Sequence, residues 1–168
     1  QLAPAGTHKI RVTAAATYMV ASCTTACPAG QNIYLDNFSL IDSTFPTERL
    51  VNGNLNALGA PAGWAVEKTA EDNLSFTGAA SFAAHTGNTG LWLRSFAGGD
   101  AKILQTVPAV AGEDYTFTAW GKLQHGHSGL DPLGSTVTFM TMEFLDGSNA
   151  VIGSPVTKNI VFEYVWDA

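Results

Sequence analysis

Apolar and polar side chains alternate with a period of two residues along much of the chain. The alternating stretches are residues 8–13, 31–40, 91–96, 102–107, 115–120 and 136–144. Because successive side chains of a strand point to opposite faces, the pattern predicts strands with one buried face. An Asp-Gly-Ser-Asn turn at 146–149 predicts a hairpin between two further strand segments.

Helical periodicity is absent from the sequence. The run Ala14-Ala15-Ala16 favours a helix by propensity, but Val12-Thr13 and Thr17-Tyr18 flank it with strand-forming residues. Roughly ten short strands separated by turns predict an all-β fold, an antiparallel β-sandwich of the jelly-roll kind. Alternation stops at 42–47 and resumes at Leu50, which predicts a linker at 43–49.

Composition narrows the class of protein. The chain has 168 residues, enough for one domain, and 10% of them are aromatic, which excludes a disordered polymer. Only 13% are charged, the net charge is −6 and no basic cluster occurs, so we expect no nucleic-acid partner. No apolar run approaches the roughly 18 residues of a membrane-spanning helix, so we expect no membrane partner. Gln1 stands where an initiator Met would, and we expect a mature or excised piece.

Two cysteines, Cys23 and Cys27, lie in a loop-like stretch. A metal or redox pair is one interpretation, but the second pair of ligands typical of zinc sites is absent. The interpretation we favour is a small disulfide that constrains a loop. Such a bond implies an oxidising compartment, and we therefore expect an extracellular protein.

Motifs for catalysis are missing from the sequence. It contains no nucleophile elbow, no phosphate-binding glycine loop and no zinc-protease motif. His125 and His127 offer two imidazoles, yet they lie in a glycine-rich stretch with no neighbouring cysteine, which favours a solvated loop. We therefore expect no enzyme and no cofactor.

Two tryptophans fall in predicted strands near planar polar side chains. Trp92 has Arg94 close by in sequence, and Trp120 has Gln124. Flat aromatic rings with planar polar neighbours are typical of sugar-binding sites, because the apolar face of a sugar stacks on a ring. The alternative is that these large side chains fill the core or an interface between subunits. Asn73, in Asn73-Leu74-Ser75, is a candidate N-glycosylation site.

Several segments together resemble carbohydrate-binding modules of the galactose-binding-like jelly-roll type. Residues 50–56, 63–64, 103–107 and 111–120 are similar to the opening two-thirds of such modules, and residues 3–12 and 34–40 to their closing strands. The resemblance implies the fold and leaves function open. Such modules often have a Phe-Glu pair that helps hold a structural calcium; here Leu55 and Asn56 stand there, which leaves Asp36 as a candidate ligand.

The order of these segments differs from that of the family, because the closing segment comes first. The aromatic segment 162–167 would lead, in the family, into an Ala-Pro-Ala-Gly turn like that at 3–6. We therefore predict that residues 1–42 close one jelly roll and 50–168 open the next, in a neighbouring subunit or repeat. A closed circular permutant is the alternative.

Head-to-tail completion of this kind does not close on itself, so it propagates. The sequence therefore predicts a structural subunit of an extracellular filament whose partners are copies of itself. The alternative is a carbohydrate-binding module of a secreted protein, with glycans as partners.

Overall fold

The computed structural model describes residues 1–19, 32–56, 62–69, 74–77, 83–94, 99–123 and 137–160. Its strands are β1 (Lys9–Met19), β2 (Asn32–Asp42), β3 (Ala65–Lys68), β4 (Leu74–Thr77), β5 (Gly90–Arg94), β6 (Gly99–Pro108), β7 (Tyr115–Leu123), β8 (Val137–Leu145) and β9 (Val151–Asn159). None of the described residues is helical, which confirms the prediction of an all-β chain. Accordingly, this part of the chain contains no helix suited to cross a membrane.

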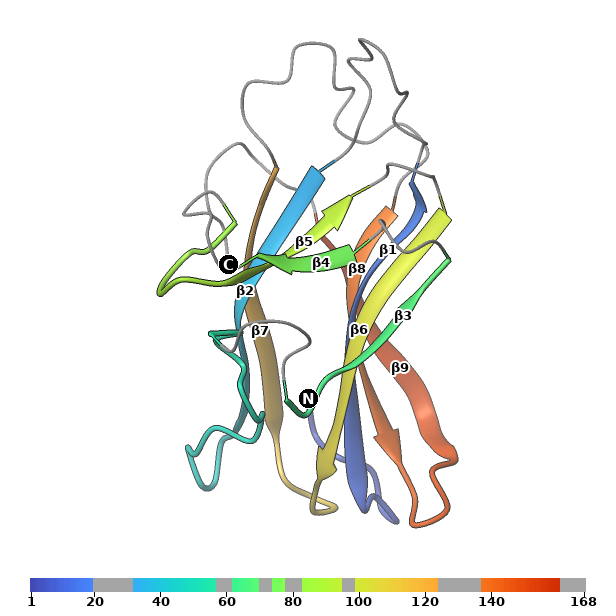
Figure 1. Cartoon of the computed structure of the whole chain (residues 1–168). Coiled ribbons are helices and arrows are strands. Elements are labelled where there is room, and N and C mark those ends of the chain that lie inside the picture. The colour runs from blue at the N-terminus through green and yellow to red at the C-terminus, as the bar shows by residue number, and fades with distance from the viewer. Residues whose placement is uncertain are drawn as a thin grey trace, which may run out of the picture.

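The strands form two antiparallel sheets that face each other as a sandwich (Figure 1). The five-stranded sheet has the order β3-β6-β1-β8-β9, and the four-stranded sheet has the order β4-β5-β2-β7. The predicted antiparallel β-sandwich is therefore confirmed, and the finer jelly-roll topology stays a prediction. The hairpin at 146–149 also forms, since the Asp146 N–H donates to the Ala150 carbonyl at 2.9 Å.

The first two strands of the chain occupy the centres of the two sheets. β1 lies between β6 and β8, and β2 lies between β5 and β7. In a single chain, therefore, β1 and β2 build one sandwich together with β3–β9, and the closing strands are supplied by the chain itself. Exchange of these strands between neighbouring copies or repeats stays a prediction.

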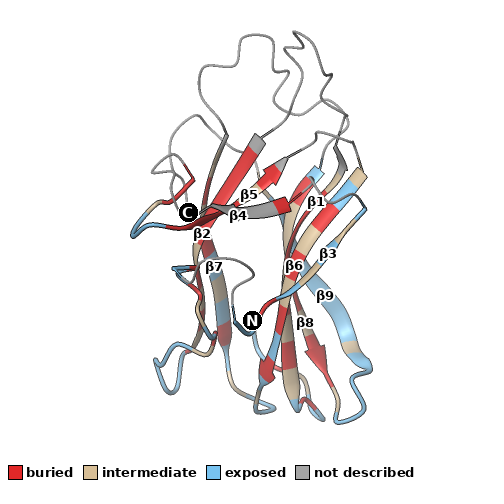
Figure 2. Cartoon of the chain, viewed as in Figure 1, coloured by how far each residue is buried: buried red, intermediate tan, exposed pale blue. Residues whose placement is uncertain are grey.

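The core lies between the sheets, and the central strands provide much of it (Figure 2). Ile10 and Val12 of β1 are fully buried, as predicted from the alternation. Phe38 of β2 stacks on Phe117 of β7, with 6.3 Å between ring centroids, and is 5.1 Å from the ring of Trp64. The alanines at 14–16 continue β1 as a strand and are buried, because a small side chain suits a strand with sheet neighbours on both sides.

β2 differs from the prediction of one buried face. Tyr34 and Asp36 point away from the core side of β2, yet they are only 1% and 0% exposed. A β-bulge follows them: the pairing with β7 shifts between Asp36 and Ser39, and Asn37 has a positive φ of 49°. The extra residue explains why Leu35 and Phe38 both point into the core although they are three positions apart.

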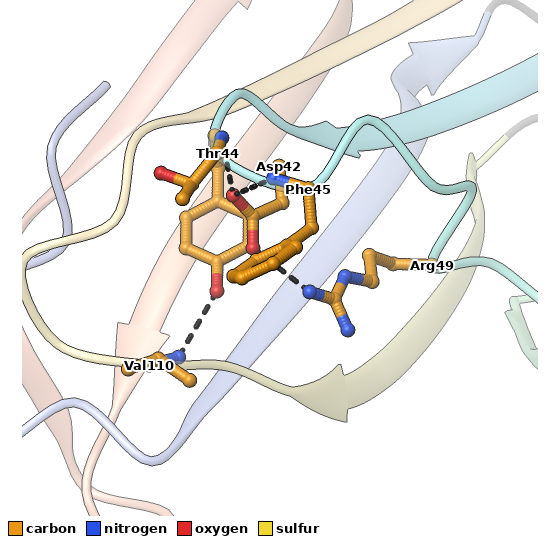
Figure 3. Close-up of polar contacts among 6 residues, drawn as sticks. Asp42, Thr44, Phe45, Arg49 and Val110 are labelled. Carbon is orange, nitrogen blue, oxygen red and sulfur yellow. Dashed lines mark hydrogen bonds and ion pairs between the residues drawn. The ribbon is translucent and has the colours of Figure 1, made fainter.

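The turn after β2 joins the two parts of the chain and is organised by a buried carboxylate (Figure 3). Asp42 Oδ1 accepts hydrogen bonds from the N–H groups of Thr44 and Phe45, and Arg49 donates to Asp42 Oδ2 at 2.8 Å. Glu48 contributes a second carboxylate to the same turn. Its Oε1 accepts hydrogen bonds from the N–H groups of Leu40, before the turn, and Leu50, after it. Most residues of the predicted linker 43–49 are therefore exposed, but hydrogen bonds to the carboxylates of Asp42 and Glu48 hold its backbone.

We expect replacement of Asp42 by Asn to remove a stabilisation that depends on pH. Desolvation alone would raise the pKa of Asp42, but the N–H groups of Thr44 and Phe45 and the Arg49 guanidinium outweigh it and hold the pKa below its usual value of 3.8. A carboxyl group whose pKa is lowered on folding stabilises the fold above pH 3.8. This stabilisation is lost as the pH falls from 3.8 through the lowered pKa.

At pH 7 the Asp42→Asn variant should therefore unfold several degrees below the unmodified chain, and the gap should narrow below pH 4. Thermal unfolding followed by circular dichroism at pH 7 and pH 3 measures this. Glu67→Gln, which breaks an exposed ion pair with Lys102, is the control and should change little at either pH. An equal difference in melting temperature between Asp42→Asn and the unmodified chain at pH 7 and pH 3 would contradict the lowered pKa of Asp42.

Candidate functional site

The outer side of the four-stranded sheet carries a row of aromatic and cationic side chains. Tyr34 of β2 pairs with Trp92 of β5 on one side and with Lys122 of β7 on the other. Trp120 of β7 pairs with Asp36 in the next row. Because paired residues present their side chains on the same face, these residues share one surface. We call Tyr34, Trp92, Trp120 and Lys122 the aromatic face.

Contacts within the aromatic face are close. The rings of Tyr34 and Trp92 are 6.1 Å apart at a tilt of 45°, and the Lys122 Nζ lies 5.7 Å from the centre of the Tyr34 ring. Burial raises the pKa of Tyr34 to about 12 and lowers that of Lys122 from its usual value. At neutral pH the tyrosine is therefore an uncharged ring beneath a cation, an arrangement that favours attraction between the two.

The loop at 83–89 covers part of this surface. The His85 imidazole lies parallel to the Trp120 ring, with centroids 4.1 Å apart and an angle of 10°. The Asn37 amide contacts His85 Nδ1 at 3.0 Å, while its oxygen accepts a hydrogen bond from the Thr86 hydroxyl. Asn37 therefore contacts two residues of this loop through the two ends of its side-chain amide.

Asp36 anchors this loop. Its Oδ2 accepts hydrogen bonds from the N–H groups of His85 at 2.8 Å and Thr86 at 3.1 Å, and its Oδ1 accepts the N–H of Asn37 at 2.7 Å. Burial raises the pKa of Asp36, although these N–H groups and His85 oppose the shift. A buried carboxylate therefore holds the loop on the aromatic face together with the Asn37 side chain.

The hydrogen bonds of Asp36 also concern its predicted role as a calcium ligand. Both oxygens of Asp36 are surrounded by N–H donors, whereas a cation needs several oxygen ligands. Among the described residues, no group of three or more His, Cys, Asp or Glu side chains could hold a metal ion. Leu55 is buried and Asn56 accepts the N–H of Asn88, so both have structural contacts here.

The structure brings together some of the predicted site residues. Trp92 and Trp120 share the aromatic face on either side of β2, and both are half-buried. Arg94 ends β5, opposite Asn32. Several predicted residues lie outside the described part of the chain: Cys23, Cys27, Asn73, Gln124, His125, His127 and the segment 162–167.

Sequence reasoning did not find Tyr34, Lys122 or His85. Tyr34 lies at an outward position of the predicted strand 31–40, whereas Lys122 lies beyond the predicted strand 115–120, in the part of β7 that the alternation did not include. Alternation alone also does not say which strands become neighbours. His85 lies in a loop without a recognisable motif, and its contacts with Asp36, Asn37 and Trp120 bring it to the face.

A second feature is an open cleft of about 700 Å³ between the two sheets, beside β7. Its walls are largely apolar: Leu35, Phe117, Ala119, Met140, Met142 and Ile160 line it. In the described part of the chain, β7 pairs along its length with β2 alone, and only its first residues have a partner on the other side. We call this opening the β7 cleft. Among the described residues, the four-stranded sheet ends at this cleft while the opposite sheet continues.

Comparison of the chain with protein-family models, with characterised proteins and with solved structures finds no significant match. Function is therefore inferred from the geometry of the aromatic face and of the β7 cleft.

Proposed function

We propose that the protein is a structural subunit of an extracellular filament and joins copies of itself head-to-tail by strand complementation. The observation that carries this proposal is the β7 cleft. An open apolar cleft beside a strand edge supports the addition of a further strand, which would pair with the edge and bury its apolar side chains.

The placement of β1 and β2 also supports assembly. Within the part of the chain that the structure describes, both strands form ladders only with strands that follow residue 50, and none with each other. The same pairings are therefore available to strands from a neighbouring copy, as in domain swapping. A contact between the head of one copy and the tail of another is heterologous, so it propagates into a fibre unless the rotation closes a ring.

Negative-stain electron microscopy, combined with light scattering after size exclusion, tests this proposal. We expect filaments, or a mean mass that rises with concentration. A single mass equal to that of the 17.6 kDa chain at every concentration, with no filaments on the grid, would contradict it.

Glycan binding is the second candidate, and the aromatic face favours it. Trp92 is half-buried beside Tyr34, and Lys122 lies on the other side of Tyr34, which supports stacking of a sugar face on the indole with a cation on the same face. Trp120 offers less, because His85 already covers one face of its ring. Trp92 is therefore the residue on which this candidate depends.

We expect Trp92→Ala to weaken binding of any glycan found on an array by about 5- to 150-fold, since ring stacking contributes about 1–3 kcal/mol by analogy with stacking on nucleic-acid bases. Isothermal titration calorimetry with the folded variant measures the loss. Phe45→Ala removes an aromatic ring that is 61% exposed in the turn after β2 and should leave affinity unchanged. Silence of the unmodified protein on a glycan array would remove this candidate.

A further inference from the structure

A third cleft, of about 410 Å³, lies beside the bulge of β2, and most of the side chains that line it are polar. β2 contributes Asn37 and Ser39, and the segment after the turn contributes Glu48, Asn52 and Asn54. The volume lies within the range of small-molecule sites, in which a few well-placed polar groups fix the ligand. We call this hollow the bulge cleft.

The backbone on both sides of the bulge cleft is held in place. The Phe38 N–H donates to the Gly53 carbonyl at 2.9 Å. A Cβ atom at Gly53 would lie 2.1 Å from the Phe38 carbonyl oxygen, so only glycine permits this close approach. Glu48 Oε1 accepts two N–H groups, one from β2 and one from the segment after the turn. The cleft is therefore formed before any ligand binds.

Several polar groups of the bulge cleft have no hydrogen-bond partner among the described residues. They are the Ser39 hydroxyl, the second carboxylate oxygen of Glu48 and the Asn52 Nδ2, which is buried. A buried donor without a partner costs free energy, so a ligand that supplies an acceptor is favoured. A hydroxyl, an amide and a carboxylate offer donors and acceptors together, which suits sugar hydroxyls, since each of these both donates and accepts.

Charge distinguishes between neutral and acidic sugars at this cleft. Glu48 is the one charged side chain in its described lining. The neighbouring Arg49 is paired with Asp42 at 2.8 Å. The carboxylate of Glu48 would repel an acidic sugar, whereas its free oxygen can accept a strong hydrogen bond from the hydroxyl of a neutral one.

The bulge cleft adjoins the aromatic face. Ser39 pairs with Thr118, and Trp120 lies two residues further along β7 on the same face, about 7 Å away. Asn37 also links the two regions, because its amide contacts His85, which stacks on Trp120. A chain of sugar units on the aromatic face would therefore reach the bulge cleft.

We propose that the bulge cleft binds one unit of a neutral oligosaccharide whose neighbouring units lie on the aromatic face. This inference rests on glycan binding, the second candidate function, and it names both the class of sugar and a second part of the site. The cleft recognises hydroxyl groups through Ser39, Glu48 and Asn52, and the aromatic face provides the ring for stacking.

Isothermal titration calorimetry tests the proposal with β-1,4-linked hexamers of glucose, xylose and mannose, and with a hexamer of galacturonic acid. We expect at least one neutral hexamer to bind and the acidic hexamer not to bind. For the neutral hexamer, Ser39→Ala should weaken binding by about 2- to 12-fold. Glu48→Gln should weaken it by about 12- to 150-fold, because it keeps Oε1 for the two N–H groups and replaces the free acceptor with a donor.

The matched controls make the same chemical changes outside the cleft. Ser43→Ala lies in the exposed turn, and Glu113→Gln lies in the turn before β7, so both should leave affinity unchanged. Circular dichroism verifies that each variant is folded. If Glu48→Gln does not fold, Ser39→Ala and NMR of the unmodified chain decide: the side-chain amide signals of Asn52 and Asn54 should shift when the neutral hexamer binds.

The other outcomes separate this inference from the function on which it rests. Full affinity in both cleft variants, with binding lost in Trp92→Ala, would leave glycan binding standing and overturn the role of the bulge cleft. Unshifted Asn52 and Asn54 signals with the hexamer bound would do the same. Tighter binding of the acidic hexamer would contradict the choice of a neutral sugar. Failure of every hexamer to bind would remove the glycan candidate and this inference together.

Discussion

A chain that begins at Leu50 is expected to lose its cooperative unfolding transition and to regain it when residues 1–42 are added as a separate polypeptide. The reason is position: β1 and β2 are the strands that join β6 to β8 and β5 to β7. Without them each sheet falls into two parts that have no ladder in common. Circular dichroism during thermal unfolding measures the effect.

The expected loss is as large as the whole stability of an ordinary domain. Six large apolar side chains of β1 and β2 are at least 98% buried: Ile10, Val12, Ile33, Leu35, Phe38 and Leu40. Burying each contributes about 1.5–3 kcal/mol, or about 9–18 kcal/mol together. A typical domain is stable by only about 5–15 kcal/mol.

A break in the exposed turn is the matched control. Two polypeptides that meet between residues 45 and 46 retain every strand, and we expect them to fold together when mixed. A cooperative transition of residues 50–168 alone would contradict the central role of β1 and β2, and would instead support the division of the chain into parts of two consecutive jelly rolls.

The second large effect is expected from Asp36→Ala. The carboxylate accepts three backbone N–H groups, and its loss leaves those donors without their partner while the loop at 83–89 loses its anchor. Hydrogen bonds to charged groups contribute about 1.5–3 kcal/mol each, or about 4.5–9 kcal/mol for the three. Because burial of the carboxylate offsets part of this sum, we expect a loss of about 3–6 kcal/mol in the free energy of unfolding. Urea unfolding followed by tryptophan fluorescence measures it, and also reports the environment of Trp120 beside His85.

Asp114→Ala is the control for this substitution. Asp114 is exposed and pairs with the Gln1 amine, so its replacement should cost less than about 1 kcal/mol. A loss of similar size in both variants would show that the anchoring role of Asp36 is wrong.

Asp36 and Asp42 should also respond to pH with opposite signs. Because burial raises the pKa of Asp36 above its usual 3.8, the folded chain binds a proton there more tightly than the unfolded chain does. Its contribution to stability therefore falls as the pH rises from 3.8 to the raised value. Asp36→Asn should remove this fall in stability with rising pH. Asp42→Asn should instead remove a rise in stability, which occurs over a lower pH interval.

Local patterns in the sequence predicted the strands that carry alternation, the absence of helix in the described residues and the hairpin at 146–149. They did not predict β3 or β4, which are four residues each and too short for a clear period. They also did not predict the full length of β9, because Gly153 and Pro155 interrupt its pattern and most of it is exposed.

The aromatic face illustrates the same limit. Trp92 and Trp120 were candidates from their own positions, but their common surface depends on which strands flank β2. The bulge at Asn37 had a sequence signal, the spacing of three between Leu35 and Phe38 in an otherwise alternating strand. The hydrogen bond from His85 to Asp36 had no sequence signal, since the two residues are far apart along the chain.

The sequence by itself determined which residues point to the same side of each strand, because that depends on a period of two along a local segment. Only the tertiary structure decided which strands become neighbours, because pairing brings together segments that the sequence separates by long loops. It placed β1 and β2 at the centres of the two sheets of their own chain and, among the described residues, left the cleft at β7. Alternation specifies the faces of a strand, whereas edges and clefts arise only when the strands are assembled.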